Sequence, residues 1–271
     1  MKLKDYLNED LGRGDVTSEA LLGNERAVGV IVAKEPCVVA GLKEAAALFG
    51  LARLRVRLRA KDGQRVRRGA VVLRVEGRAR DILKVERTAL NFIMRMSGIA
   101  TETRRLVGVA RRANKRVMVA ATRKTTPGFR EYEKRAVELG GGWAHRRTLS
   151  DFVLIKDNHL RLVGAIEEAL KRARKAKKKV EVEVTSLRGA ERAAKHGADV
   201  IMLDNMTPRE ARRAYIRIKA IDRGILVEVS GGITPENIRR YARWADIISL
   251  GWLTHSARAR DFSLEMVEGG Q

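Results

Sequence analysis

Short apolar runs rich in valine, isoleucine and leucine recur through the second half of the chain. There are six of them, at 117–121, 152–155, 180–184, 199–203, 225–229 and 246–250. Each run is followed by a segment with helical spacing, which is the pattern of repeated βα units around a parallel sheet. Parallel barrels place all strand C-termini on one face, where barrel enzymes build their active sites. The pattern therefore predicts an α/β barrel over about residues 113–255, with a site assembled from the ends of these runs.

The first hundred residues follow a different pattern. A helix is expected at about 3–9, followed by a turn-rich loop at 9–17. Alternating or apolar runs predict strands at 27–34, 37–40, 54–60 and 71–76, with a helix between them at 42–49. Turn residues such as Lys61-Asp62-Gly63 separate these runs. We expect a small α+β domain with an antiparallel sheet.

The segment that links these regions is helical in pattern from 79 to 112. The Ser97-Gly98 pair is expected to break it into two helices, and one more short helix is expected at 256–267. The chain is thus divided into a small domain at 1–100, a barrel domain at 101–256, and a C-terminal helix and tail at 257–271. With only six clear strands, an incomplete barrel is predicted.

Composition narrows the class of protein. At 271 residues and 45% hydrophobic content, the chain is long enough for a full barrel or for one large and one small domain. The single cysteine, Cys37, allows no internal disulfide, and neither a secretory signal nor a membrane-spanning run is apparent. We therefore expect a cytoplasmic protein without a membrane partner. Two glutamines and one cysteine among many lysines and arginines are typical of thermophile composition.

The net charge of +23 raises nucleic acid as a partner. The densest basic run is 171–179, and a solvated helix end explains it most simply, because cations suit the C-terminal dipole. No aromatic residue is interleaved with this run, so stacking on bases has no support. We expect no nucleic-acid partner. The alternative is salt-dependent binding of DNA or RNA carried by 171–179.

Cationic side chains follow two of the predicted strands. Thr122, Arg123 and Lys124 end the first run, where an adjacent arginine and lysine offer a forked donor for a carboxylate and a point charge for a phosphate. A charged surface loop is the alternative interpretation. Lys156 ends the second run, where it is expected to point at ligand. Asp157-Asn158 are more simply interpreted as caps of the next helix.

Two glycine-rich segments are suited to anions. Gly140-Gly141-Gly142 lies shortly before His145 and Arg146, and glycines permit close approach of the backbone to a ligand. Ser230-Gly231-Gly232 joins a strand to a helix, where backbone N–H groups and the helix start favour phosphate. Barrel folds often bind phosphate after their late strands. Two later residues that could close the same site are Gly251 and His255.

Carboxylates occupy two neighbouring predicted strands. Glu181 and Glu183 lie two residues apart in VEVEV and so share one face, while Asp204 ends the next strand. Carboxylates inside a barrel are costly unless they are paired or bind a cation. Mg²⁺ takes one or two carboxylates together with substrate oxygens, which makes Glu183 and Asp204 candidate metal ligands. Salt bridges to Arg123 or Lys124 are the alternative.

Taken together, these segments resemble the quinolinate phosphoribosyltransferase family, the nicotinate-nucleotide pyrophosphorylases. The resemblance covers nearly the whole chain through EDLGRGDVTS, ERTALNFIMRMSGIAT, TRKTTPG, the GGG–HR segment, LIKDNH, VEVEV, IMLDN, SGGI and GWLTHS. It implies an N-terminal α/β sandwich domain and an incomplete seven-stranded α/β barrel. It also implies a homodimer with shared active sites, in which the small domain of one subunit covers the barrel mouth of the other. A hexamer is left open.

The resemblance assigns roles around the aromatic substrate. It implies that Arg123, His145 and Arg146 hold the carboxylates of quinolinate. Arg87, from ERTALN, would reach the same site from the partner subunit. Thr122 also belongs to the implied substrate site. Two departures from the family pattern adjoin this segment, because Ala144 stands where asparagine is usual and Thr148 where glycine is usual.

The resemblance also assigns the phosphoribosyl pyrophosphate site. Lys124 and Lys156 would lie between the two substrates, and Glu183 and Asp204 would bind ribose hydroxyls and Mg²⁺-pyrophosphate. These four residues are the predicted catalytic residues. The 5′-phosphate would be held by Ser230, Gly231, Gly232 and Gly251, with His255 nearby. The predicted reaction converts quinolinate and phosphoribosyl pyrophosphate to nicotinate mononucleotide, pyrophosphate and CO₂. A phosphoribosyltransferase for nicotinate or another small anionic base is the alternative enzyme.

Overall fold

The structure is a computed structural model that describes residues 2–267. The chain packs into two compact units. The first comprises the chain up to Arg104, Pro127–Gly141 and the chain from Ala257, and the second comprises Arg105–Thr126 and Gly142–Ser256. The domain boundaries predicted from the sequence stay a prediction, because these units are defined by packing and are not contiguous in sequence.

The first unit is built on an antiparallel sheet. Within the described chain, its strand order is β12-β1-β5-β3, formed by Phe262–Val267, Arg26–Ala33, Val71–Arg78 and Arg55–Leu58. A second small sheet pairs β2 (Cys37–Val38) with β4 (Arg65–Val66). The helices of this unit are α1 (Leu3–Leu11), α2 (Val16–Leu21), α3 (Leu42–Leu51), α5 (Arg130–Leu139) and the first part of α4. The predicted α+β domain with an antiparallel sheet is confirmed, with element ends shifted by a few residues.

The C-terminal segment forms a strand, so the helix predicted at 256–267 is wrong. β12 pairs antiparallel with β1, from Phe262 opposite Ala33 to Val267 opposite Val28. The sequence FSLEMV contributes one buried aromatic side chain, Phe262, which is 4% exposed. Strand preference depends on the neighbouring strand more than on the local sequence, and β1 offers an edge whose backbone groups need partners.

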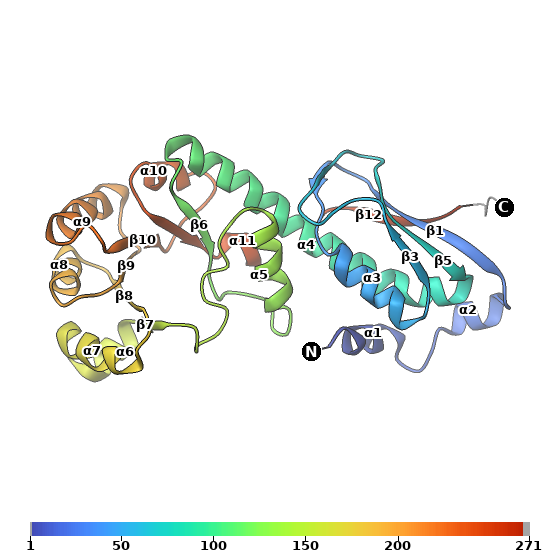
Figure 1. The fold of residues 1–271 in the computed structure, drawn as a ribbon, viewed down its shortest axis with the longest axis horizontal. Coiled ribbons are helices and arrows are strands. Elements are labelled where there is room, and N and C mark those ends of the chain that lie inside the picture. Colours follow the sequence, from blue (N-terminus) through green and yellow to red (C-terminus); the bar gives the residue numbers. More distant parts are fainter. Residues whose placement is uncertain (1, 268–271) are drawn as a thin grey trace. The chain divides into compact units, whose positions relative to one another are not determined.

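The linking helix α4 runs unbroken from Ala79 to Ala113, so the break predicted at Ser97-Gly98 is also wrong (Figure 1). Ser97 is fully buried, and its Oγ lies 2.9 Å from the backbone nitrogen of Ala40 and 3.2 Å from its carbonyl oxygen. A Cβ on Gly98 would collide with the carbonyl oxygen of Arg258 and lie 2.9 Å from Cα of Ala259. Both residues therefore allow close packing and do not end the helix.

The second unit contains the predicted parallel sheet. Among residues 2–267 its strand order is β6-β11-β10-β9-β8-β7, and every neighbouring pair is parallel. The strands are Met118–Ala121, Ile247–Leu250, Leu226–Ser230, Val200–Asp204, Val180–Val184 and Val153–Ile155. A single parallel bridge joins Ala120 to Trp143 on the other side of β6. All six apolar runs form strands, and the predicted incomplete α/β barrel is confirmed.

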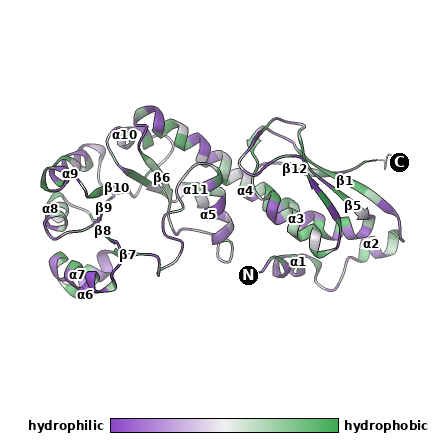
Figure 2. Cartoon of the chain, in the orientation of Figure 1, coloured by the Kyte–Doolittle hydropathy of each residue, from purple (hydrophilic) through white to green (hydrophobic). Residues whose placement is uncertain are grey.

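Helical segments follow the strands of this unit (Figure 1). They are α6 (Asp157–Val163), α7 (Ile166–Ala173), the short 3₁₀ turn η1 (Arg174–Ala176), α8 (Leu187–Lys195), α9 (Pro208–Ile221), α10 (Ile238–Ala242) and α11 (Trp252–His255). Hydrophilic stretches alternate with hydrophobic ones along these helices, as expected for helices that bury one face (Figure 2). From Lys2 to Val267, no helix combines the length and apolar character needed to span a bilayer.

Alternation along the strands builds layers inside the barrel. Met118, Ala120, Val200, Leu226 and Ile247 pack together in one apolar cluster, in which Leu226 lies beside Val200. Two residues farther along the strands, the parallel register sets Glu228 beside Met202. The strand ends carry polar residues, with Ser230 beside Asp204 in the same register. The barrel therefore has an apolar floor and a polar mouth, which places the site at the C-terminal ends of the strands.

Candidate active site

A cavity of about 470 Å³ opens at the mouth of the barrel. It is lined by every site residue predicted from the sequence except Arg87, Gly251 and His255. The lining residues that were predicted are Thr122, Arg123, Lys124, His145, Arg146, Lys156, Glu183, Asp204, Ser230, Gly231 and Gly232. The lining residues outside that prediction are Leu154, Met202, Asn205, Glu228 and Ser249. Residues spread over more than a hundred positions thus meet in one pocket.

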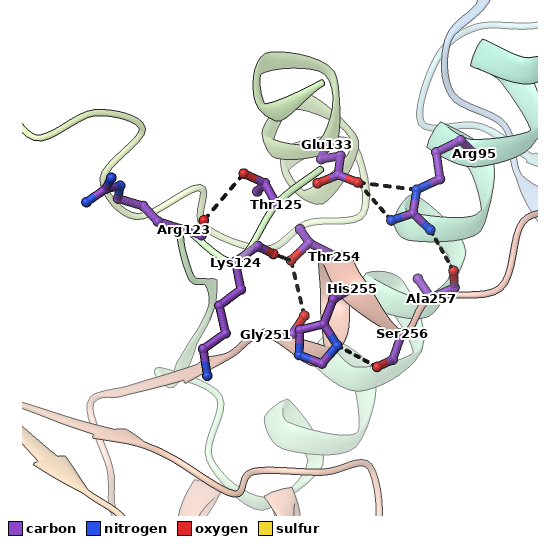
Figure 3. Close-up of polar contacts among 10 residues, drawn as sticks. All are labelled: Arg95, Arg123, Lys124, Thr125, Glu133, Gly251, Thr254, His255, Ser256 and Ala257. Atoms are coloured by element: carbon purple, nitrogen blue, oxygen red, sulfur yellow. Dashed lines mark hydrogen bonds and ion pairs between the residues drawn. The ribbon is translucent and has the colours of Figure 1, made fainter. Parts of the chain in front are cut away.

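Gly251 and His255 adjoin this pocket through Lys124. A Cβ on Gly251 would lie 2.7 Å from Nε2 of His255 and 3.1 Å from Cδ of Lys124, so the glycine leaves room for both side chains (Figure 3). The His255 ring is held through Nδ1, which lies 2.7 Å from Oγ of Ser256. Arg87 is exposed on the part of α4 that belongs to the first unit. It is absent from the lining of the pocket.

The loop after β6 is fastened to the start of α11. The Thr254 hydroxyl is fully buried and lies 2.6 Å from the carbonyl oxygen of Lys124 and 3.1 Å from that of Gly251 (Figure 3). The backbone N–H of Lys124 donates to Oγ1 of Thr122 at 3.1 Å. Because its backbone is fixed in this way, the long Lys124 side chain starts from a defined position, and it passes beside Gly251.

Arg123 and Arg146 form the cationic part of the pocket. Arg146 is only 7% exposed, and burial together with the charge of Arg123 lowers the pKa of its guanidinium. Nε of Arg123 is buried and has no hydrogen-bond partner among residues 2–267. Two neighbouring cations, one with an unsatisfied buried donor, are costly to desolvate together. The arrangement is therefore suited to a ligand with carboxylates, which match guanidinium groups as forked acceptors.

His145 lies above two buried carboxylates. Its Nε2 is 3.1 Å from Oε2 of Glu228 and 3.4 Å from Oε2 of Glu181, and all three side chains are at most 6% exposed. Burial alone would lower the pKa of the imidazole, but its hydrogen bonds to Glu181 and Glu228 raise that pKa to about 9. Burial and the charge of Glu228 raise the pKa of the Glu181 carboxyl to about 7. The ring is therefore a cation at neutral pH.

Lys156 and the two carboxylates nearest the pocket mouth, Glu183 and Asp204 (the outer carboxylates), lie at or near strand ends. Nζ of Lys156 forms an ion pair with Oε2 of Glu183, so the partner of this glutamate is Lys156, not Arg123 or Lys124. Oδ2 of Asp204 accepts from Nδ2 of Asn205 at 2.8 Å. The backbone N–H of Lys156 donates to Nδ1 of His159 at 2.9 Å. It is therefore His159, not Asp157 or Asn158, that satisfies this donor where α6 begins.

The turn after β10 contains two glycines that let a ligand approach its backbone closely. Gly231 and Gly232 have φ of +79° and +60°, in the region that favours glycine. A Cβ on Gly231 would collide with the side chain of Asn205 and lie 2.7 Å from its backbone nitrogen. Nδ2 of Asn237 donates to the carbonyl oxygen of Gly232 at 2.8 Å and fixes the turn. These glycines leave open the side of the pocket where phosphate is predicted.

Glu228 is the residue of chemical interest that the sequence reasoning missed. It lies in LVEVS, within an apolar run that was interpreted only as a strand. A signal was available, because a single carboxylate in the middle of a barrel strand needs a partner, just as Glu181 does in VEVEV. In the structure Glu228 is fully buried and supplies half of the carboxylate pair under His145.

Comparison with known proteins agrees with this site. The family models described as quinolinate phosphoribosyl transferase, N-terminal domain and C-terminal domain, match residues 15–97 and 99–265. The chain is 48% identical over 258 residues to "Probable nicotinate-nucleotide pyrophosphorylase [carboxylating]" of Archaeoglobus fulgidus, covering 94% of this chain and 99% of that protein. It is 42% identical to the human "Nicotinate-nucleotide pyrophosphorylase [carboxylating]", covering 86% and 80%.

A solved structure agrees as well. The crystal structure of NadC from Streptococcus pyogenes superposes with a TM-score of 0.90 at 39% identity, covering 98% of this chain and 96% of that one. Both family models match in chain order, and the two curated relatives and the solved structure align over most of the chain. The chain therefore belongs to the quinolinate phosphoribosyl transferase family.

Proposed function

We propose that the protein transfers the phosphoribosyl group of phosphoribosyl pyrophosphate to quinolinate and releases nicotinate mononucleotide, pyrophosphate and CO₂, a step of de novo NAD biosynthesis. The observation that carries this proposal is the Arg123–Arg146 pair in the barrel mouth. Two neighbouring guanidinium groups, one with an unsatisfied Nε, call for a dianionic ligand. Quinolinate carries two adjacent carboxylates and meets that requirement.

The aromatic diacid would bind among Arg123, His145 and Arg146. All three side chains are cationic and line the same cavity. Thr122 lines the cavity beside them, at the end of β6. A neutral base or a monoacid would leave at least one of the two guanidinium groups without a substrate carboxylate, which costs affinity in a desolvated pocket. The site therefore supports a diacid over nicotinate.

The phosphoribosyl donor would occupy the opposite part of the pocket. Ser230, Gly231 and Gly232 line it with a glycine turn, and Gly251 and His255 adjoin it through Lys124. Backbone N–H groups in such turns cradle phosphate without side-chain hindrance. We assign the 5′-phosphate to this turn, and the ribose and pyrophosphate to the region of Lys156, Glu183 and Asp204.

The outer carboxylates fit Mg²⁺, which we propose as the metal. Glu183 and Asp204 line the cavity at neighbouring strand ends, and carboxylate oxygens are the ligands that Mg²⁺ prefers. Neither belongs to a cluster of three protein ligands within residues 2–267. Such a site suits an ion that keeps substrate oxygens and waters as further ligands. When bound, Mg²⁺ neutralises charge on the pyrophosphate.

The reaction then follows from the positions of these groups. The pyridine nitrogen attacks the anomeric carbon of ribose while the bond to the pyrophosphate oxygen breaks. Lys124 lies where it can donate to the departing pyrophosphate, whose charge grows as the bond lengthens. In the pyridinium adduct, the carboxylate next to the nitrogen leaves as CO₂, and the ring carbon takes up a proton. Arg123 and Arg146 hold the ring in line by its carboxylates.

The decisive test is an assay of the purified protein with quinolinate, phosphoribosyl pyrophosphate and MgCl₂. We expect nicotinate mononucleotide by chromatography, with one CO₂ released per mononucleotide. Nicotinate in the same assay should react far more slowly. Absence of mononucleotide at every temperature up to unfolding would contradict the proposal. A faster reaction with nicotinate would assign the protein to the alternative phosphoribosyltransferase.

Two further features belong to the proposal. We infer a homodimer in which Arg87 of each chain serves the site of its partner, as the resemblance to the family implies; Arg87 is an exposed side chain of the first unit. We place the enzyme in the cytoplasm, in keeping with a single cysteine, Cys37, that is buried and forms no disulfide within the described chain. Nothing in the pocket calls for a nucleic acid or a membrane.

A further inference from the structure

The pair of buried glutamates under His145 is not used by the proposed reaction. Glu181 is 1% exposed and Glu228 is fully buried, and they come from two strands, β8 and β10, that are separated by β9. Their Oε1 atoms have no hydrogen-bond partner within residues 2–267. Burying two carboxylates without full hydrogen bonding is costly, so a compensating role is expected at this point.

The orientation of the His145 ring is fixed on several sides. The ring packs against Trp143 with centroids 4.7 Å apart and against Phe152 at 5.1 Å. Both carboxylates approach the same ring atom, Nε2. The backbone of His145 is held at φ of +54°, a conformation that is uncommon for a residue with a side chain. Such a conformation persists only where the surroundings hold it.

This arrangement leaves Nδ1 of His145 for the ligand. The residue lines the cavity, and no hydrogen bond to Nδ1 occurs among the residues from Lys2 to Val267. A histidine whose Nε2 faces two carboxyl groups keeps a proton there, and hydrogen bonds to both of them favour the doubly protonated ring. The Nδ1–H is then the ring donor left for a ligand of the cavity that His145 lines. Arg146 and Arg123, the other charged groups nearby, point to the same kind of ligand, an anion.

We propose that Glu181 and Glu228 are positioning residues that orient His145, so that its Nδ1–H donates to a carboxylate of the aromatic diacid substrate. This inference rests on the proposed function. Glu181 lies outside the lining of the cavity, and Glu228 lines it with a fully buried side chain, so both act through the ring. They determine affinity for the diacid, and they leave the phosphoribosyl donor and the chemical step unaffected.

Steady-state kinetics of Glu228→Gln test the proposal. Glutamine fills the same volume but removes the anionic acceptor from Nε2. We expect the KM for quinolinate to rise about 10- to 100-fold, the range typical for losing a hydrogen bond to a charged group. The KM for phosphoribosyl pyrophosphate and kcat should change by less than about threefold. If Glu228→Gln does not fold, Glu181→Gln gives the same test, because its carboxylate shares Nε2.

A double-mutant cycle separates action through His145 from direct action. If the glutamates act through the ring, then Glu228→Gln should add almost nothing in a His145→Ala background. A Glu228→Gln effect that multiplies in full with that of His145→Ala would overturn the proposal. The matched control is Glu44→Gln, which changes a buried glutamate of the first unit that pairs with Arg135. It should alter stability and leave the KM for quinolinate unchanged.

Metal analysis provides an independent check. His145, Glu181 and Glu228 offer ligand atoms within 4.8 Å of one another, close enough to hold a cation. Stoichiometric Zn²⁺ or Mn²⁺ in the purified protein, with quinolinate binding lost on chelation at this site, would replace the positioning role. A different result tests the proposed function. Wild-type protein without activity on quinolinate refutes the function, whereas active wild-type protein with unaltered Glu228→Gln kinetics refutes only this inference.

Discussion

The Arg123–Arg146 pair places two guanidinium groups beside each other in the pocket, where they are suited to the carboxylates of a ligand. Truncating either side chain leaves a substrate carboxylate without its forked donor. We expect Arg123→Ala and Arg146→Ala each to weaken quinolinate binding by about 2–5 kcal/mol, the cost of breaking a desolvated charge pair. Isothermal titration with quinolinate measures this directly. Arg239→Ala, at an exposed position of α10 outside the pocket lining, is the control and should bind normally. Unchanged affinity in both pocket variants would remove these arginines from the substrate site.

The charge of His145 gives the site a pH dependence. The pKa of its imidazole is raised to about 9, so the ring is positive below that pH and neutral above it. A positive ring attracts a substrate carboxylate, and a neutral one does not. The KM for quinolinate should therefore rise as pH passes 9, whereas a change near pH 7 would report the ionisation of Glu181, whose carboxyl pKa burial and the charge of Glu228 raise to about 7. The matched variant, His145→Ala, should show a high KM without this rise. A wild-type KM that stays constant as pH passes 9 would show that the charge of His145 does not govern binding of the diacid.

At this scale, residues at or near strand ends could be predicted from the sequence, as could the alternating Glu181 and Glu183, whereas the single mid-strand Glu228 was not. Lys156 and Asp204 end apolar runs and Glu183 lies one residue before the end of its strand, so the parallel fold brings them to one cavity. The ion pair of Lys156 with Glu183 depends on which strands are neighbours, and β7 lies beside β8 only in the folded sheet. Glu228 was missed because its partner, His145, comes from a loop whose path no periodicity describes.

The long helix α4 offers a test at the scale of an element. Gly98 faces the backbone of Arg258 and Ala259, so Gly98→Ala should force a backbone shift and destabilise the protein by at least about 1–3 kcal/mol, the range for overpacking. Gly108 lies in the same helix and would meet nothing within 4 Å. Gly108→Ala should therefore stabilise the protein by about 0.5–1 kcal/mol, through helix propensity. Chemical denaturation measures both. Equal effects would show that Gly98 is not a close-packing residue.

Helices and strands could be predicted where the hydrophobic periodicity is strong. The prediction was wrong where contacts with a neighbouring element determine the local structure. The six barrel runs form strands because buried parallel strands are nearly continuous in apolar residues. Ser97-Gly98 has the local appearance of a helix break, but the polar groups of Ser97 are satisfied by the backbone of Ala40. The strand β12 exists because β1 has an open edge, which a local pattern cannot reveal.

At the scale of the whole molecule, the chain enters the first unit, leaves it, and returns twice. Pro127–Gly141 and the chain from Ala257 belong with the N-terminal part, although long stretches of sequence separate them. These returns rest on long-range packing, which carries no local signal. The net charge of +23 is likewise a whole-molecule property and has no role in the fold. In the second unit, part of that charge lines the pocket, while the run 171–179 is largely exposed.

Arg87 raises the question of assembly. It looks like an ordinary helix-surface charge on α4, and its side chain does not line the cavity of its own chain. If it serves the partner's site, an isologous dimer is obligatory for activity, because each site then takes residues from two chains. Arg87→Ala alone should lower activity with quinolinate and leave the thermal midpoint of the protein nearly unchanged, since an exposed side chain contributes little to folding.

Mixing inactive variants tests this shared site. In a heterodimer of Arg87→Ala with Lys156→Ala, one composite site carries both lesions and the other carries neither, so co-refolding should restore up to about half the activity per heterodimer. The control pairs Arg123→Ala with Lys156→Ala, two residues that line one cavity of a single chain. Every site in that heterodimer keeps one lesion, and mixing should restore nothing. If the Arg87 mixture also stays inactive, with heterodimers demonstrated by mass spectrometry, Arg87 does not act across the dimer. The assigned reaction would be unaffected by that result, because it rests on residues of a single pocket.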